Sequence, residues 1–140
     1  MASIASISSL LVPNKTVEVE YPGFPGFVLT LCFMSRESLV SIRKRATKTS
    51  FKNRQAIEEF DEELFLKLYV EHTVKGWKGL TTGYLEQLAP VDVSDVDSNT
   101  EIEFSADNAL ALMKASADFD AFISEQVSNL GNFSSSTQKR

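Results

Sequence analysis

Residues 60–80, FDEELFLKLYVEHTVKGWKGL, constrain the fold more than any other stretch of this chain. Apolar side chains recur in this stretch with helical spacing and form a broad stripe, which is typical of a helix that contacts more than one neighbour. Asp61 precedes the stripe as a predicted N-cap, and Gly76 or Gly79 supplies a left-handed residue to end the helix. We therefore expect a central helix around which the other elements pack.

The composition indicates one globular domain. A chain of 140 residues with 43% hydrophobic residues has enough apolar surface for a single core. Its net charge of −5 makes it a poor candidate for a duplex-binding protein, because phosphate neutralisation supplies most of the non-specific affinity of such proteins. The single cysteine, Cys32, excludes an intramolecular disulfide and a Cys-based zinc site, and fits a reducing, cytoplasmic setting.

The N-terminal third predicts a β-hairpin. Residues 16–21 alternate between apolar and acidic side chains, as in a strand with one face in water. The turn Pro22-Gly23-Phe24-Pro25-Gly26 follows, and residues 27–34 then form a strand that is apolar on both faces. We expect these strands to pair antiparallel and the second to be covered on both sides. The longest apolar runs, such as residues 27–34, are too short to cross a bilayer, so no membrane contact is expected.

Helical signals dominate the remainder. Ser35 is the predicted N-cap of a helix that runs to about Thr47, with a loop after it. Further helices are expected over residues 81–88, after Ser105, and from about residue 119 until Gly131. The predicted fold class is α+β, mainly α: an N-terminal antiparallel β-hairpin followed by four to five helices packed around the central one. A single domain of residues 16–133 would lie between a flexible tail of residues 1–15 and a disordered tail of residues 134–140.

A basic cluster extends from Arg43 to Arg54. Lys44, Arg45, Lys48 and Lys52 lie between these two residues, and such a cluster is capable of contacting nucleic acid or an acidic partner. The alternative is a solvated helix face. We favour the solvated face, because the whole chain is acidic and no aromatic residue interleaves with the basic ones within the helix.

An acidic loop partly matches a calcium site. Asp95, Asp97 and Asn99 fit the first three ligand positions of an EF-hand loop. The glycine of the sharp turn is replaced by Thr100 and the bidentate glutamate by Ala106, so an ordinary acidic loop is expected.

No other pattern in the sequence indicates catalysis. His72 is the only histidine and lacks a recognisable nucleophile or metal-ligand partner, and Cys32 lies in an apolar strand without basic neighbours in sequence. No phosphate loop, nucleophile elbow or zinc-protease motif is present in the sequence. We therefore expect a protein that is not an enzyme and that uses no cofactor or metal.

Aromatic residues are the best candidates for a partner surface. The ten phenylalanines exceed what the core of so small a domain easily buries. Core packing remains the more common role for any one of them. The candidates for partner contact are Trp77, Leu80, Phe119, Phe122 and Phe133.

Several of these segments together resemble the tail assembly chaperones of long-tailed bacteriophages. The most distinctive are Val74-Lys75-Gly76-Trp77-Lys78-Gly79-Leu80 and the helix start Phe104-Ser105-Ala106-Asp107-Asn108-Ala109-Leu110. The hairpin, the basic helix opened by Ser35-Arg36-Glu37, the helix from Phe60-Asp61 to Val74, and a C-terminal block with Asp118-Phe119, Phe122-Ile123 and Asn132-Phe133 complete the resemblance.

The resemblance implies a non-enzymatic protein made in the cytoplasm of an infected host. It would coat the long, aggregation-prone tape measure protein, keep it soluble, help recruit the tail tube protein, and be absent from the mature virion. Many copies would coat one long helix, so the expected partners include further copies of this chain. Two alternatives stay open: a small phage structural protein of the connector or tail tube, and a nucleic-acid-binding regulator that uses residues 43–54.

Overall fold

The computed structural model of the chain describes residues 6–7, 10–11 and 15–133. The predicted tail of residues 134–140 and most of the predicted tail of residues 1–15 lie outside the described residues.

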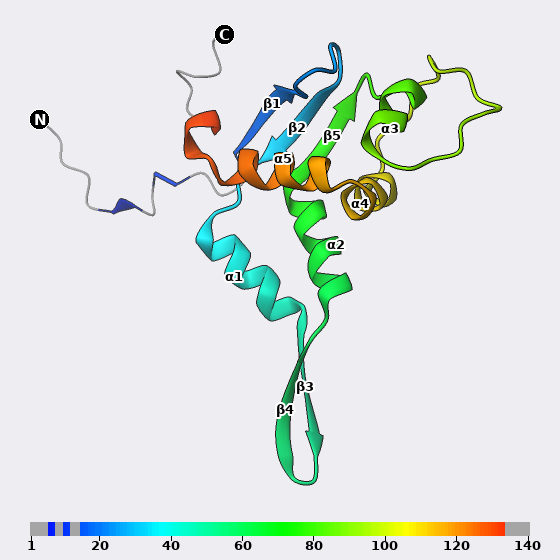
Figure 1. Cartoon of the computed structure of the whole chain (residues 1–140). Helices are drawn as coiled ribbons and strands as arrows, with labels where there is room; N and C mark the ends of the chain where they lie inside the picture. The colour runs from blue at the N-terminus through cyan, green and yellow to red at the C-terminus, as the bar shows by residue number, and fades with distance from the viewer. Residues whose placement is uncertain (1–5, 8–9, 12–14, 134–140) are drawn as a thin grey trace, which may run out of the picture.

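Helices and strands are mixed along the described part of the chain (Figure 1). The expectation of a mainly α protein is wrong, because five strands in two sheets accompany five α-helices in this part of the chain. In chain order the elements are β1 (Thr16–Glu20), β2 (Val28–Cys32), α1 (Arg36–Arg45), β3 (Thr47–Lys52), β4 (Gln55–Phe60), α2 (Glu62–Thr73), β5 (Val74–Lys78), α3 (Thr82–Leu88), α4 (Ala106–Ala115), α5 (Ala117–Ser128) and a 3-10 turn (Leu130–Phe133).

The larger sheet has the strand order β1-β2-β5, and both strand pairs are antiparallel. The predicted hairpin is confirmed: β1 pairs with β2 in a register that places Val17 beside Leu31 and Val19 beside Leu29. The cover expected on the second face of residues 27–34 is found at Cys32 and Met34, whereas Val28 and Thr30 on that face are half-buried.

The central helix α2 is shorter than its apolar pattern predicts. Asp61 caps it as expected, with its side chain accepting a hydrogen bond from the Leu64 N–H, but the helix ends at Thr73. Val74 is already extended and is the first residue of β5, which pairs with β2 from Val28 to Leu31. The hydrogen-bonding groups of β2 thus determine the conformation of a segment whose own pattern continues the helix.

Residues 47–60 form a second hairpin where we expected the end of a helix and a loop. Helix α1 ends at Arg45, and β3 and β4 form a two-stranded sheet of their own that projects away from the other elements (Figure 1). Asn53 and Arg54 connect the strands with φ angles of 53° and 66°, the left-handed conformation that two-residue hairpin turns require.

The core lies between the larger sheet and the helices. Helix α5 crosses one face of this sheet and buries Phe119, Ile123 and Val127 against it (Figure 1). Helix α2 contacts α1, α4 and β5, which confirms that the central helix has several neighbours. The predicted N-caps Ser35 and Ser105 are both observed.

Candidate functional site

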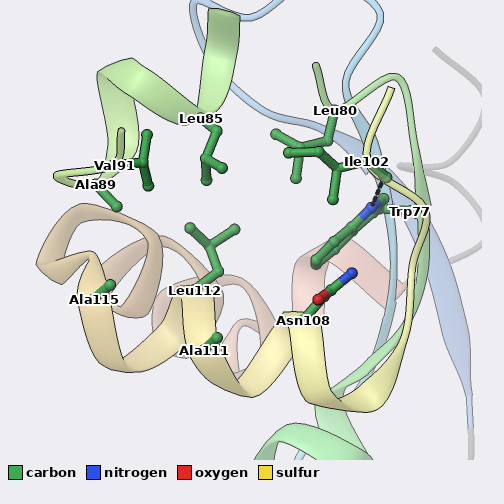
Figure 2. Close-up of a pocket in the computed structure, with 10 residues that line it drawn as sticks. All are labelled: Trp77, Leu80, Leu85, Ala89, Val91, Ile102, Asn108, Ala111, Leu112 and Ala115. Atoms are coloured by element: carbon green, nitrogen blue, oxygen red, sulfur yellow. Dashed lines mark hydrogen bonds between the residues drawn. The ribbon is translucent and has the colours of Figure 1, made fainter. Parts of the chain in front are cut away.

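An apolar pocket opens between α3, α4 and the end of β5 (Figure 2). Its volume is about 180 Å³. The residues that line it come from distant parts of the sequence: Trp77, Leu80, Leu85, Ala89, Val91, Ile102, Asn108, Ala111, Leu112 and Ala115.

Trp77 forms one wall of the pocket and is held in place from three directions. Its indole Nε1 donates a hydrogen bond of 2.9 Å to the carbonyl oxygen of Ile102. Its ring packs edge-on against Phe27 and Phe104, with centroid distances of 6.2 and 5.2 Å. Because its single donor is already used, Trp77 offers the pocket only the apolar surface of its ring.

Helix α4 supplies another wall through residues three and four positions apart. Asn108, Ala111, Leu112 and Ala115 share this face, where Leu112 points towards Leu85 of α3 (Figure 2). Ala111 and Ala115 are exposed, and their small side chains leave the backbone of α4 open to close approach.

The electrostatics of the pocket favour an apolar ligand. None of the residues that line it is charged, and its polar side chains are only Trp77 and Asn108. The Asn108 amide nitrogen donates to the carbonyl oxygen of Glu103 at 3.0 Å. The volume is also below the roughly 300–1,000 Å³ of most small-molecule sites. One or two apolar side chains from a partner suit this space better than a cofactor.

The structure places the five predicted partner residues in three different locations. Trp77 and Leu80 meet at the pocket, although Leu80 is only 1% exposed. Phe119 and Phe122 surround Tyr21, with ring centroids 6.2 and 4.6 Å from it, and Phe119 is fully buried. Phe133 packs against Phe33 and is also buried. Partner contact by any of the five stays a prediction, and Trp77 and Phe122 retain exposed surface for it.

Cys32 and His72, which the sequence left without partners, contact each other. Cys32 Sγ lies 3.8 Å from His72 Nε2, and the same nitrogen lies 3.2 Å from the carbonyl oxygen of Phe33. A carbonyl oxygen only accepts, so the contact with Phe33 is a hydrogen bond only in the tautomer that carries the proton on Nε2, and that tautomer takes no proton from the thiol. Burial raises the pKa of Cys32, against a smaller opposing effect of Lys75. An activated nucleophile needs a lowered pKa, so this geometry supports a packing contact.

The carboxylates of the acidic loop accept hydrogen bonds from residues two positions later in the chain. Asp97 Oδ1 accepts from the Asn99 N–H at 2.9 Å, and Asp92 Oδ1 accepts from both the N–H and the hydroxyl of Ser94. These bonds also lower the pKa of Asp92. Across the described residues, no three His, Cys, Asp or Glu side chains gather as a metal site would require.

The predicted basic cluster is divided between two elements. Arg43, Lys44 and Arg45 are exposed in the last turn of α1, whereas Lys48 and Lys52 lie on β3. The neighbouring strand β4 contributes Glu58 and Glu59, which dilute the positive charge of the hairpin. Among the described residues, no helix is long and apolar enough to span a membrane.

Sequence reasoning missed most of the pocket. No pattern in the sequence indicates that Leu85, Ala89, Val91 and Ile102 line a common pocket. Their proximity depends on how α3 and the following loop pack on α4. The one available signal was the pair Ala111 and Ala115, small residues four positions apart on the predicted helix after Ser105.

Comparison with known proteins supports a phage origin. No curated protein and no solved structure matches the chain. Residues 35–140 match the sequence model of a family described as YdaY prophage protein, and this match includes every residue of the pocket. Because the match extends over well more than half of the chain, the protein belongs to the YdaY prophage protein family and is phage-derived.

Proposed function

We propose that this protein is a non-enzymatic tail assembly chaperone. It binds the tape measure protein in the host cytoplasm, keeps it soluble, helps recruit tail tube subunits, and is absent from the mature virion. The phage origin of the family supports this assignment, together with the resemblance in the segments around Trp77 and Ser105.

The apolar pocket is the observation that carries the proposal. A tape measure protein is long and helical, and an amphipathic helix is commonly bound when its apolar side chains enter an apolar groove. A pocket of about 180 Å³ without charged lining residues fits the side chains of such a helix. The alanines of α4 leave room for the backbone of the bound helix, and the fixed ring of Trp77 reduces the entropy lost on binding.

The test is co-expression of the full chain with the tape measure protein encoded in the same prophage. The amount of soluble tape measure protein and its co-purification with the chain are measured. Ala111→Glu and Ala115→Glu place a charge in the pocket from exposed helix positions, so the fold is retained and both readouts fall. Ala121→Glu, an exposed position on α5 outside the pocket, is the matched control and leaves both unchanged.

Three results would contradict the proposal. Unchanged binding in both pocket variants would remove the pocket from the site, and no association with any tape measure protein would remove the chaperone function. Detection of the chain as a component of purified virions would favour a structural protein of the connector or tail tube. Trp77→Ala is a poorer probe than Ala111→Glu, because it also breaks the contacts of Trp77 with Phe27, Ile102 and Phe104.

A further inference from the structure

We propose that two copies of this chain pair through the β4 strands of their projecting hairpins, forming a four-stranded antiparallel sheet. This inference is independent of the proposed function, because it concerns the hairpin (Thr47–Phe60) and not the pocket.

The hairpin lacks the cover that two-stranded sheets need. Its strands pair only with each other, and it extends away from the other elements in Figure 1. Phe51 near its tip is 77% exposed and Phe60 at its base is 48% exposed. An isolated two-stranded hairpin is marginally stable in water, and additional strands are the usual remedy.

The register identifies the free hydrogen-bonding groups of β4. Lys52 and Gln55 flank the two-residue turn, so they exchange hydrogen bonds with each other, and the pairs then alternate along the hairpin. By this alternation Ala56 and Glu58 direct their N–H and C=O groups outward from β4. A second strand is able to pair with these groups without disturbing the hairpin.

Charge selects the β4 edge over the β3 edge. The charged side chains of β3, Lys48 and Lys52, are both positive, and lysines on an edge strand oppose pairing. The β4 edge has Arg54 at its turn end, and Glu58 and Glu59 near its base. An antiparallel partner therefore brings the positive end of each copy beside the negative end of the other.

One symmetric register satisfies both requirements. It pairs Ala56 of each copy with Glu58 of the other through backbone hydrogen bonds, and it places Ile57 opposite Ile57 across the two-fold axis. Gln55 then faces Glu59 of the second copy in a close, non-hydrogen-bonded pair. The neighbouring register centred on Glu58 would set Glu58 against Glu58, and like charges directly opposite are destabilising. The neighbouring register centred on Ala56 would set Glu58 opposite Arg54, a turn residue with a φ of 66° outside β4, and would leave only residues 55–57 of each copy paired.

Substitutions at Gln55 separate association from folding. Gln55→Glu places a carboxylate opposite Lys52 within the hairpin, which favours the fold, but opposite Glu59 of the second copy, which opposes the dimer. Gln55→Lys places a positive charge opposite Lys52, which opposes the fold of the hairpin, and opposite Glu59 of the second copy, which favours the dimer. Sedimentation equilibrium of the full chain measures the dissociation constant of the dimer. We expect Gln55→Glu to raise this constant roughly two- to thirtyfold over two symmetric contacts, and Gln55→Lys to lower it by a similar factor.

Gln87, an exposed glutamine on α3, provides the matched control. Gln87→Glu and Gln87→Lys make the same changes of charge and leave the dissociation constant unaltered. A chain that stays monomeric at all concentrations overturns the proposal. So does a dimer whose dissociation constant changes equally on substitution of Gln87 and of Gln55. A monomer that is retained on DNA or RNA in a salt-dependent way through Lys52 and Arg54 also overturns it and makes the hairpin a nucleic-acid contact.

Discussion

The indole nitrogen of Trp77 donates a hydrogen bond of 2.9 Å to the carbonyl oxygen of Ile102, a residue 25 positions later in the chain. This bond fastens β5 to the segment that leads into α4. Because Trp77 and Ile102 both line the apolar pocket, the bond also fixes the position of one pocket wall.

Trp77→Phe keeps an aromatic ring but removes the donor to Ile102. We expect the free energy of unfolding, measured by urea denaturation, to fall by about 1–2 kcal/mol, because the carbonyl oxygen loses its partner. Tyr69→Phe is the comparison, since the hydrogen bond from the Tyr69 hydroxyl to Ser124 is long at 3.4 Å. An equal loss of stability in both variants would contradict the role given to the Trp77 bond.

Gly79→Ala is expected to destabilise the protein strongly. Gly79 has a φ of +80°, and a Cβ at this position would collide with the backbone carbonyl of Gly26. We expect a loss of about 2 kcal/mol or more in thermal or urea unfolding. Gly76→Ala is the control, because its Cβ would meet nothing within 4 Å, and we expect it to be neutral or to stabilise β5 by up to about 1 kcal/mol.

Two substitutions on α4 compare a surface ion pair with core packing. Lys114 Nζ lies 2.7 Å from Glu63 Oε1, but the two side chains are 46% and 80% exposed. Lys114→Ala is therefore expected to cost at most about 1 kcal/mol in urea unfolding. Leu112→Ala removes a side chain that is 4% exposed, and we expect it to cost about 2–5 kcal/mol. The reverse order would mean that the ion pair holds α4 against α2.

Cys32 contributes to a loss of stability at alkaline pH. Burial raises its pKa above the ordinary value of 9.0, so above that pH the unfolded chain releases the thiol proton more readily than the folded one. The stabilising contribution is complete below pH 9.0 and is lost as the pH rises through the folded pKa. We expect Cys32→Ala to show a smaller decline in unfolding free energy above pH 9.0 than the unaltered chain, measured by urea denaturation at several pH values.

Tyr21 and Tyr69 also have pKa values raised by burial, so part of the alkaline decline remains in the Cys32→Ala variant. An identical decline with and without Cys32 would contradict the assignment. Alkylation of Cys32 at neutral pH is expected to be slow in the folded chain, because its side chain is fully buried.

The phage origin of the chain and its resemblance to a chaperone family are separate results. The family match establishes the first. The second rests on short segments, of which the Gly76-Trp77-Lys78-Gly79 element was interpreted as the end of a helix. In the structure it is the end of β5 and the turn after it, so the backbone is extended and not helical, and its Trp77 lines the pocket.

The local features of the fold were predictable from the order of residues alone. Ser35, Asp61 and Ser105 were recognisable as N-caps, because each precedes an apolar helical pattern and offers an oxygen to the first free N–H groups. The first hairpin was recognisable from its alternating side chains and the Pro-Gly turn. Each of these signals lies within a few residues of the helix or turn that it specifies, so it predicts that element without knowledge of contacts to distant parts of the chain.

The conformation of residues 74–78 and the pocket depend instead on contacts between distant segments. Val74 and Trp77 continue the helical spacing of α2, but the open edge of β2 offers hydrogen bonds that a helix cannot accept there, so this segment becomes β5. The second hairpin was not predicted, because its turn is Asn53-Arg54 and contains no glycine. The pocket joins β5, α3, the following loop and α4, and its shape depends on packing between segments that the sequence does not place relative to one another.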